Sequence, residues 1–192
     1  MATDLSTVRL AAQGRADSAQ AALNSLFRSG HPPAGPLEGG YAGELMHVDL
    51  APGLTQLARA IAAGWMPWKG KAFHSSSPTG ENIFSRDSLF LTRLFWPFYL
   101  GVKEDPTSPP STDSQETYRA FAFRTRLAPG LTDPDRTVLK IDYDIAGNPG
   151  PSIRRVLDEV VEISPSVLLG KAHLHWWWGT WQTVAYFTLT RR

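Results

Sequence analysis

Residues 166–190 read SVLLGKAHLHWWWGTWQTVAYFTLT, two apolar-rich runs that meet at Gly179-Thr180. Two runs rich in aliphatic and aromatic residues, joined by a two-residue turn that contains glycine, are typical of a β-hairpin. We therefore predict two antiparallel strands at this end of the sequence, over 166–178 and 181–190.

Alternation of apolar and polar residues continues upstream of this hairpin. This alternation gives each strand one face toward the core and one face toward solvent. The run at 88–100 is apolar on both faces, and we expect this strand to be covered on both sides. Residues 151–163 open with a predicted helical turn and continue as a strand. The other predicted strands lie at 41–50, 68–75, 82–85, 117–127 and 136–144.

Many short strands without the spacing of β-α-β units predict a closed antiparallel barrel, because closure removes exposed sheet edges. The predicted fold class is mostly β: an antiparallel lipocalin-like β-barrel over residues 39–190, with an N-terminal helix and one short internal helix. A two-sheet sandwich is the alternative. The length of 192 residues fits a single domain, 1–192.

Two segments favour helices. Residues 15–28 are rich in alanine and leucine and end before Ser29-Gly30. Residues 53–63 carry an apolar stripe at helical spacing, formed by Leu54, Leu57, Ala58 and Ile61. Residues 101–116 contain three prolines among serines, threonines and acidic residues, and we predict a long mobile loop there.

The composition excludes several classes of function. Lysine and arginine total 19 and aspartate and glutamate 18, a formal net charge of +1, so no basic surplus is available to bind a phosphate backbone. We therefore expect no nucleic-acid partner. The absence of cysteine excludes disulfides and thiol chemistry and is compatible with a reducing cytoplasm. No long apolar stretch and no secretory signal are visible, so we expect a cytoplasmic protein without a membrane span.

Tryptophan is the most informative residue type, because the chain contains seven of them and Trp176–Trp178 are consecutive. On a strand, period two sends Trp177 to one face and its two neighbours to the other, so one face is a cavity wall or an exposed patch. An eight-stranded barrel is wide enough to enclose one small molecule. The alternative is that the rings fill the core or cover a contact between two copies in a homodimer.

The first functional hypothesis is therefore a binding protein whose barrel cavity takes one small apolar or amphiphilic molecule. Rings supply the apolar wall of such a site, and a few polar groups orient the ligand. Lys69 and Lys71, close to Trp68, are placed to hold a ligand carboxylate at the barrel mouth. The predicted lining consists of Tyr41, Trp68, Phe121, Phe123 and Trp177, with Lys71 or Arg124 as polar anchors.

The second hypothesis is an enzyme in the same cavity, a cofactor-independent isomerase, cyclase or lyase that acts on a hydrophobic intermediate. An inward orientation of the face that carries Asp142 and Asp144 would bury carboxylates beside cations. The outward orientation is favoured because charged residues are rarely buried, and we interpret Asp158 and Glu159 in the same way. The candidate catalytic residues are Asp142, Asp144 and His173.

A metal site is the remaining possibility that the histidines raise. His173 and His175 stand at i and i+2 of a predicted strand, a spacing at which two imidazoles can reach one ion. No third ligand is evident in the sequence, and functional metal sites usually have more ligands than two. We therefore predict no metal site and no cofactor.

Several short motifs resemble one bacterial family. Residues 39–43, Gly-Gly-Tyr-Ala-Gly, resemble a G-x-W-x-G signature with tyrosine in place of tryptophan, and residues 68–73, Trp-Lys-Gly-Lys-Ala-Phe, are similar to the W-x-G-K-x-F element that follows it. Tyr143-Asp144, the 154–158 stretch, Leu169-Gly170 and residues 186–191 are similar in order to the second half of proteins with paired GXWXG and domain-of-unknown-function modules. The resemblance implies a compact lipocalin-like or calycin-like barrel and carries no catalytic residue with it.

Overall fold

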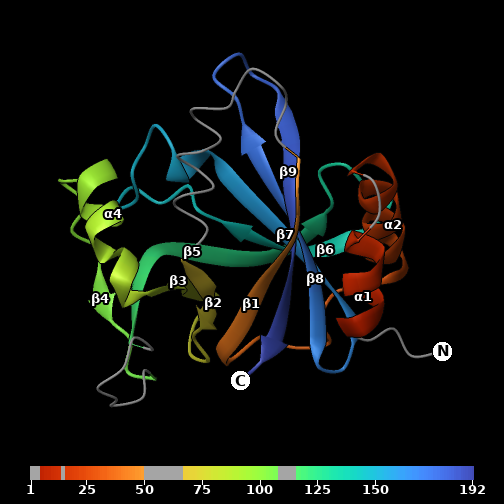
Figure 1. Cartoon of the computed structure of the whole chain (residues 1–192), viewed down its shortest axis with the longest axis horizontal. Coiled ribbons are helices and arrows are strands. Elements are labelled where there is room, and N and C mark those ends of the chain that lie inside the picture. The colour runs from red at the N-terminus through yellow and green to blue at the C-terminus, as the bar shows by residue number, and fades with distance from the viewer. Residues whose placement is uncertain (1–4, 14–15, 50–66, 108–115) are drawn as a thin grey trace.

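The structure of the chain is a computed structural model (Figure 1). The helix predicted over 53–63 and Trp65 fall outside the residues that the structure describes, as do residues 108–115 of the predicted loop. The described residues are 5–13, 16–49, 67–107 and 116–192.

An eight-stranded antiparallel barrel forms the body of the molecule, as the alternating sequence predicts. Each barrel strand pairs with the next strand around the ring. The pairing of β1 with β9 joins the first strand to the last, and the pairing of β3 with β5 completes the closure. A short strand, β4 (Lys103–Glu104), adds to the edge of β5. The barrel strands are β1 (Gly39–Val48), β2 (Trp68–Phe73), β3 (Thr79–Ser85), β5 (Thr117–Pro129), β6 (Thr137–Asp142), β7 (Val156–Ser164), β8 (Val167–His175) and β9 (Trp181–Arg191).

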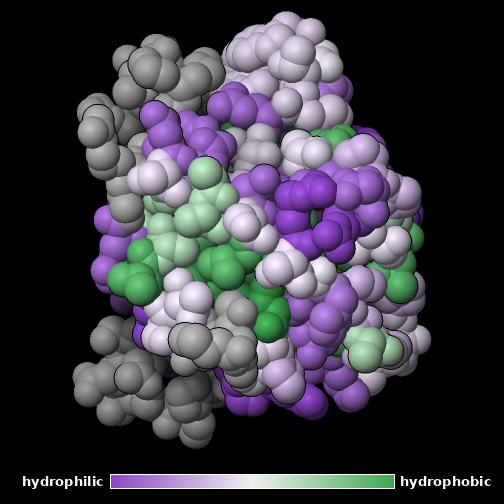
Figure 2. Space-filling view, turned by 90° about the vertical axis from the view of Figure 1, so that its right-hand side faces the viewer, coloured by the Kyte–Doolittle hydropathy of each residue, from purple (hydrophilic) through white to green (hydrophobic). Residues whose placement is uncertain are grey.

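Two helices, α1 (Leu5–Ala12) and α2 (Ala16–Ser29), lie against the outside of the barrel, at the right of Figure 1. The predicted helix over 15–28 corresponds to α2, and α1 precedes it. Phe27 and Leu23 are buried on α2 and pack with Leu169 of β8 in a second apolar cluster on this side of the barrel wall. The face that carries these helices is largely hydrophilic, with a hydrophobic group of residues to one side (Figure 2).

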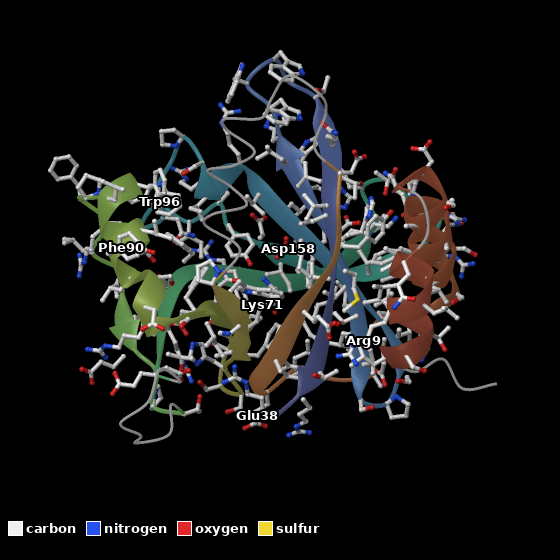
Figure 3. The ribbon with its side chains drawn as sticks, in the orientation of Figure 1. Arg9, Glu38, Lys71, Phe90, Trp96 and Asp158 are labelled. Carbon is white, nitrogen blue, oxygen red and sulfur yellow. The ribbon has the colours of Figure 1, made fainter. Side chains whose placement is uncertain are left out.

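The strand predicted over 88–100 is wrong. A 3-10 turn, Arg86–Ser88, leads into helix α4 (Leu89–Phe95), so this run contributes a short internal helix to the described part of the chain. The run is apolar on both faces, but not all of its apolar side chains are buried. Helix α4 exposes part of its apolar surface, including Phe90, which lies at the outer edge of the molecule in Figure 3. Periodicity alone does not separate a short apolar helix from a buried strand.

Trp176–Trp178 do not lie on a strand as predicted. Strand β8 ends at His175, and the three tryptophans form the turn of the hairpin. The Trp176 N–H donates to the Thr180 carbonyl at 2.8 Å, and Gly179 adopts a positive φ of 91°. Trp176 is buried and stacks in parallel on Trp178, with ring centroids 4.9 Å apart.

Within the described residues, no helix is long and apolar enough to cross a bilayer.

Candidate ligand-binding site

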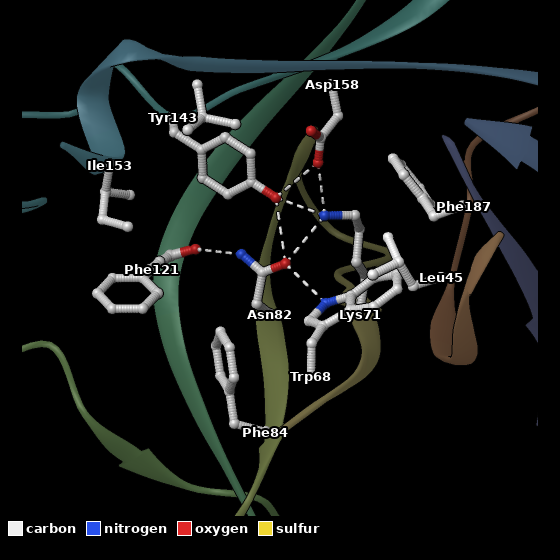
Figure 4. Close-up of a pocket in the computed structure, with 11 residues that line it drawn as sticks. Leu45, Trp68, Lys71, Asn82, Phe84, Phe121, Tyr143, Ile153, Asp158 and Phe187 are labelled. Atoms are coloured by element: carbon white, nitrogen blue, oxygen red, sulfur yellow. Dashed lines mark hydrogen bonds and ion pairs between the residues drawn. The ribbon is translucent and has the colours of Figure 1, made fainter. Parts of the chain in front are cut away.

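Inside the barrel, side chains from several strands enclose a cavity (Figure 4). The cavity has a volume of about 40 Å³. Partly exposed Leu45 and Trp68 belong to the lining and mark where the cavity meets the surface. The apolar lining consists of Leu45, Phe84, Phe121, Ile153, Val156 and Phe187.

Lys71 is the centre of a polar cluster in this otherwise apolar cavity. Its ammonium donates to Asp158 Oδ2 at 2.7 Å, to Asn82 Oδ1 at 2.9 Å and to the Tyr143 hydroxyl. Both charged groups are buried, with 2% of the Lys71 side chain and 4% of the Asp158 side chain exposed. Figure 3 places the pair in the middle of the barrel.

A β-bulge in β2 brings Lys71 to this position. In a regular strand Lys69 and Lys71 would share one face. The register of β2 against β3 shifts between Trp68 and Gly70, so Lys69 is exposed while Trp68 and Lys71 both turn inward and bond to Asn82 Oδ1. The prediction that Lys69 and Lys71 lie together at the barrel mouth is therefore wrong.

A second bulge aims Phe121 at the cavity. The register between β3 and β5 shifts at this residue, and Phe121 has a φ of 56°, a left-handed conformation that is strained for a phenylalanine. Its N–H donates to the Tyr99 hydroxyl at 2.6 Å, and its ring stacks on Tyr99 with centroids 4.9 Å apart. Bulges are common beside functional sites because they re-aim a side chain.

Burial governs the electrostatics of the cluster. Desolvation lowers the pKa of Lys71, and the carboxylate of Asp158 opposes this shift. Desolvation raises the pKa of Tyr143 well above its ordinary value, and the nearby Asp158 carboxylate adds to the rise. Four aromatic rings, those of Trp68, Phe123, Tyr143 and Phe187, have centroids 5.2–5.5 Å from Lys71 Nζ and stabilise its charge.

One atom of the cluster has no partner among the described residues, the second carboxylate oxygen of Asp158. Oδ2 accepts hydrogen bonds from Lys71 and from Tyr143, the latter at 3.0 Å. Oδ1 is buried and accepts none in the described part of the chain. In Figure 4 it points away from the Lys71 ammonium. A buried carboxylate oxygen without a donor is uncommon in folded proteins.

Of the predicted lining residues, Trp68, Lys71 and Phe121 line the cavity. Tyr41 and Phe123 are buried beside it in the core, where each packs edge to face on Phe73 with centroids 5.3 Å apart. The packing of these two rings fills one part of the barrel and limits the size of the cavity.

Two predicted ligand residues lie elsewhere. Arg124 is exposed at the point where β5 passes from β3 to β6. Trp177 is 60% exposed at the tip of the β8–β9 hairpin. Arg124 fails as an anchor because the bulge at Phe121 changes which residues of β5 face inward, and Trp177 fails because the strand ends before it.

The candidate catalytic residues do not reach the cavity. Asp142 and Asp144 lie on the outside of the barrel, where they pair with Arg126 at 3.4 Å and with Arg154 at 2.6 Å. The outward interpretation of these two residues agrees with the structure. His173 is fully buried and bonds to Glu159 at 3.2 Å, on the opposite side of the wall from Asp158.

Asn82, Tyr143 and Asp158 are site residues that are not among those predicted from the sequence. The prediction that Asp158 lies on an outward, solvated face is wrong. Asp158 and Glu159 are consecutive, and a strand must send one of two consecutive side chains to the inner face, which is a signal for one buried carboxylate. No such signal marks Asn82, because Phe84 on the same face of β3 and Ile83 on the other face are both buried apolar residues, so alternation does not select the inward face.

The histidines do not converge on an ion. His173 bonds to Glu159 and to Thr183, whereas His175 stacks on Trp181 with centroids 4.6 Å apart. Across the described residues no group of three or more potential ligands of the types His, Cys, Asp or Glu is close enough to hold a metal ion.

Comparison with known proteins identifies no family. No family model and no curated protein matches the chain. A solved structure described as "Crystal structure of protein from Thermomonospora curvata" is similar, with a TM-score of 0.52 and 16% sequence identity, covering 90% of this chain and 87% of that one. At this identity the likeness shows the fold alone. Membership of the GXWXG family stays a prediction.

Proposed function

We propose that the protein binds a small apolar or amphiphilic molecule in the barrel cavity. The observation that carries the proposal is the buried Lys71–Asp158 ion pair on the wall of an apolar, aromatic-lined cavity. A buried ion pair adds little stability compared with apolar residues of the same size. Its position on a cavity wall favours a role in orienting a ligand.

The size of the cavity limits the ligand. Drug-sized ligands occupy pockets of roughly 300–1,000 Å³. The cavity volume of about 40 Å³ suits the polar end of a small molecule, with its apolar body between the rings and toward Leu45. The carboxylate-bearing ligand of our sequence-based hypothesis is disfavoured, because Asp158 already supplies the anion that Lys71 needs.

A cavity-filling variant tests the proposal. In Val156→Phe the added ring occupies the cavity that Val156 lines, and in Leu127→Phe a ring is added at an exposed position as the matched control. Short-chain alcohols, ethers, amines, carboxylates and hydrocarbons are titrated, and binding is followed by the indole N–H resonance of Trp68, which bonds to Asn82. We expect binding in the wild type and in Leu127→Phe and its loss in Val156→Phe. Equal binding in all three proteins would reject the cavity as the site.

Catalysis in the same cavity is the second candidate function. Its candidate catalytic residues are Tyr143 and Asp158 in place of Asp142, Asp144 and His173. Tyr143 and Asp158 place a hydroxyl and a carboxylate 3.0 Å apart on the cavity wall, an arrangement suited to proton transfer in an isomerase, cyclase or lyase. Mass spectrometry separates the two functions, because a binding protein returns the compound unchanged and an enzyme returns a product whose formation depends on Asp158.

A further inference from the structure

We propose that the head group bound at this site is a neutral hydroxyl, the O–H of an alcohol or a phenol, which donates its hydrogen to Asp158 Oδ1. The inference rests on the ligand-binding function proposed above and specifies the chemistry that the cavity selects.

All donors of the cluster except one N–H of the Asn82 amide already have acceptors. Lys71 has three N–H groups and three acceptors, on Asn82, Tyr143 and Asp158. The Trp68 indole donates to Asn82 Oδ1 at 3.1 Å. The Asn82 amide nitrogen donates one of its two N–H groups to the Phe121 carbonyl at 3.3 Å. A head group that only accepts hydrogen bonds therefore finds at most the second Asn82 N–H, and otherwise competes with bonds that the protein has already made.

The remaining hydroxyl of the cluster is also engaged. Tyr143 has one proton, and it lies within reach of Asp158 Oδ2 at 3.0 Å and of Asn82 Oδ1 at 3.1 Å, while its oxygen accepts from Lys71. Asp158 Oδ1 is left as the buried acceptor without a donor in the described part of the chain. The cluster is thus complementary to a ligand that brings a donor.

Charge decides which donor is bound. The cluster contains one cation and one anion, so it is neutral as a whole. A carboxylate head group would add a second anion beside Asp158, and an ammonium would add a second cation beside Lys71, and either ion would also lose its hydration. A hydroxyl carries no net charge and is less costly to desolvate, and it still forms a hydrogen bond to a charged acceptor.

Four ligands that differ only at the head group test the inference on the full-length wild-type chain. They are hexan-1-ol, 1-methoxypentane, hexanoate and hexylammonium. The ether has the same heavy atoms as the alcohol and lacks the donor. We expect hexan-1-ol to bind about tenfold or more tightly than the ether, since a hydrogen bond to a charged group accounts for a factor of this order. Hexanoate and hexylammonium are expected to bind more weakly than hexan-1-ol.

The outcomes separate the inference from the function on which it rests. If the ether, hexanoate or hexylammonium binds as tightly as the alcohol and Val156→Phe abolishes that binding, the cavity is a binding site but the inference is wrong. If Val156→Phe does not weaken the binding of any of the four ligands, or if none of them binds, the proposed function fails and the inference fails with it.

A conservative variant gives a second readout. In Asp158→Asn, Lys71 and Tyr143 keep the amide oxygen oriented toward themselves, so the amide N–H₂ replaces Oδ1 and presents a donor to the cavity. The tenfold preference for hexan-1-ol over the ether is then expected to fall to about one. Circular dichroism verifies that the variant is folded. A preference that persists in folded Asp158→Asn would overturn the assignment of Oδ1 as the acceptor.

Discussion

Asp158 and Glu159 are consecutive residues of β7, and their carboxylates lie on opposite sides of the barrel wall. Asp158 faces the cavity and pairs with Lys71 at 2.7 Å. Glu159 faces outward, where it pairs with Lys140 at 3.3 Å and with His173 at 3.2 Å. Both carboxylates are buried. Each is neutralised by a residue from another strand, so one short stretch of β7 links charged groups on the two faces of the wall.

Removal of the Lys71 ammonium is expected to be strongly destabilising. In Lys71→Met the carboxylate of Asp158 stays buried without its cation, and the loss of a partner from a buried pair costs about 3–5 kcal/mol of unfolding free energy. Urea denaturation at neutral pH measures the loss. The double variant Lys71→Met/Asp158→Leu removes both charges and is expected to recover more than half of it. A single variant as stable as the wild type would contradict a buried ion pair.

The barrel could be predicted from the sequence because period two is a local property that survives in most strands. Strands predicted over 41–50, 68–75, 136–144 and 181–190 overlap observed ones. The segment at 88–100 could not be assigned in this way, because its apolar residues include Phe98 and Leu100, which are about nine-tenths exposed. Burial cannot be deduced from hydrophobicity alone at such positions.

The site was less predictable than the fold because bulges decide which residues face the cavity. The sequence predicts Lys71 and Phe121 as site residues, but the bulge in β2 separates Lys71 from Lys69 and the bulge at Phe121 leaves Arg124 outside. One inserted residue reverses every later side chain of a strand. The partners of Lys71 come from strands far apart in the chain, and no local pattern relates Asn82 to Asp158.

Glu159 is expected to make the stability of the protein depend on acid pH. Burial alone would raise the pKa of Glu159, but hydrogen bonding to His173 and Leu131 and the nearby positive charges outweigh it and lower the pKa. As the pH falls, the unfolded chain therefore takes up this proton before the folded protein does. The stabilisation by Glu159 is complete above its unfolded pKa of 4.5 and is lost as the pH falls through the folded value.

The variant Glu159→Gln isolates this contribution. It is expected to be less stable than the wild type by about 1–3 kcal/mol at neutral pH, since a buried network loses its charge. The difference should narrow as the pH falls below about 4.5, where first the unfolded chain and then wild-type folded Glu159 takes up the proton. Asp144→Asn is the control, because the Asp144 side chain is 60% exposed and its pair with Arg154 contributes little. A stability difference that does not change with pH would be evidence against this role.

The strained conformation of Phe121 is expected to depend on Tyr99. In Tyr99→Phe the buried N–H of Phe121 loses its acceptor, which costs about 1–3 kcal/mol of unfolding free energy. Thermal unfolding measures the stability, and hydrogen exchange at the Phe121 amide is expected to accelerate. An unchanged melting temperature together with a protected amide would mean that another group accepts this hydrogen bond.

Gly70, in the β2 bulge, is expected to tolerate no larger residue without a loss of stability. It has a φ of 135°, and a Cβ at this position would overlap the carbonyl oxygen of Tyr41 on the paired strand. Gly70→Ala is therefore expected to cost about 3 kcal/mol or more of unfolding free energy. Gly147→Ala is the matched control, because no atom lies within 4 Å of a Cβ there, and it is expected to change the stability by less than about 1 kcal/mol.

The same variant tests whether the bulge positions the site as well as the strand. If Gly70→Ala folds by shifting β2, Lys71 and Trp68 can no longer both reach Asn82 Oδ1, and the indole N–H resonance of Trp68 is expected to move even without ligand. Binding of hexan-1-ol should weaken in parallel with that shift. A folded Gly70→Ala protein with an unmoved Trp68 resonance and full binding would mean that Lys71 reaches the cavity without the bulge.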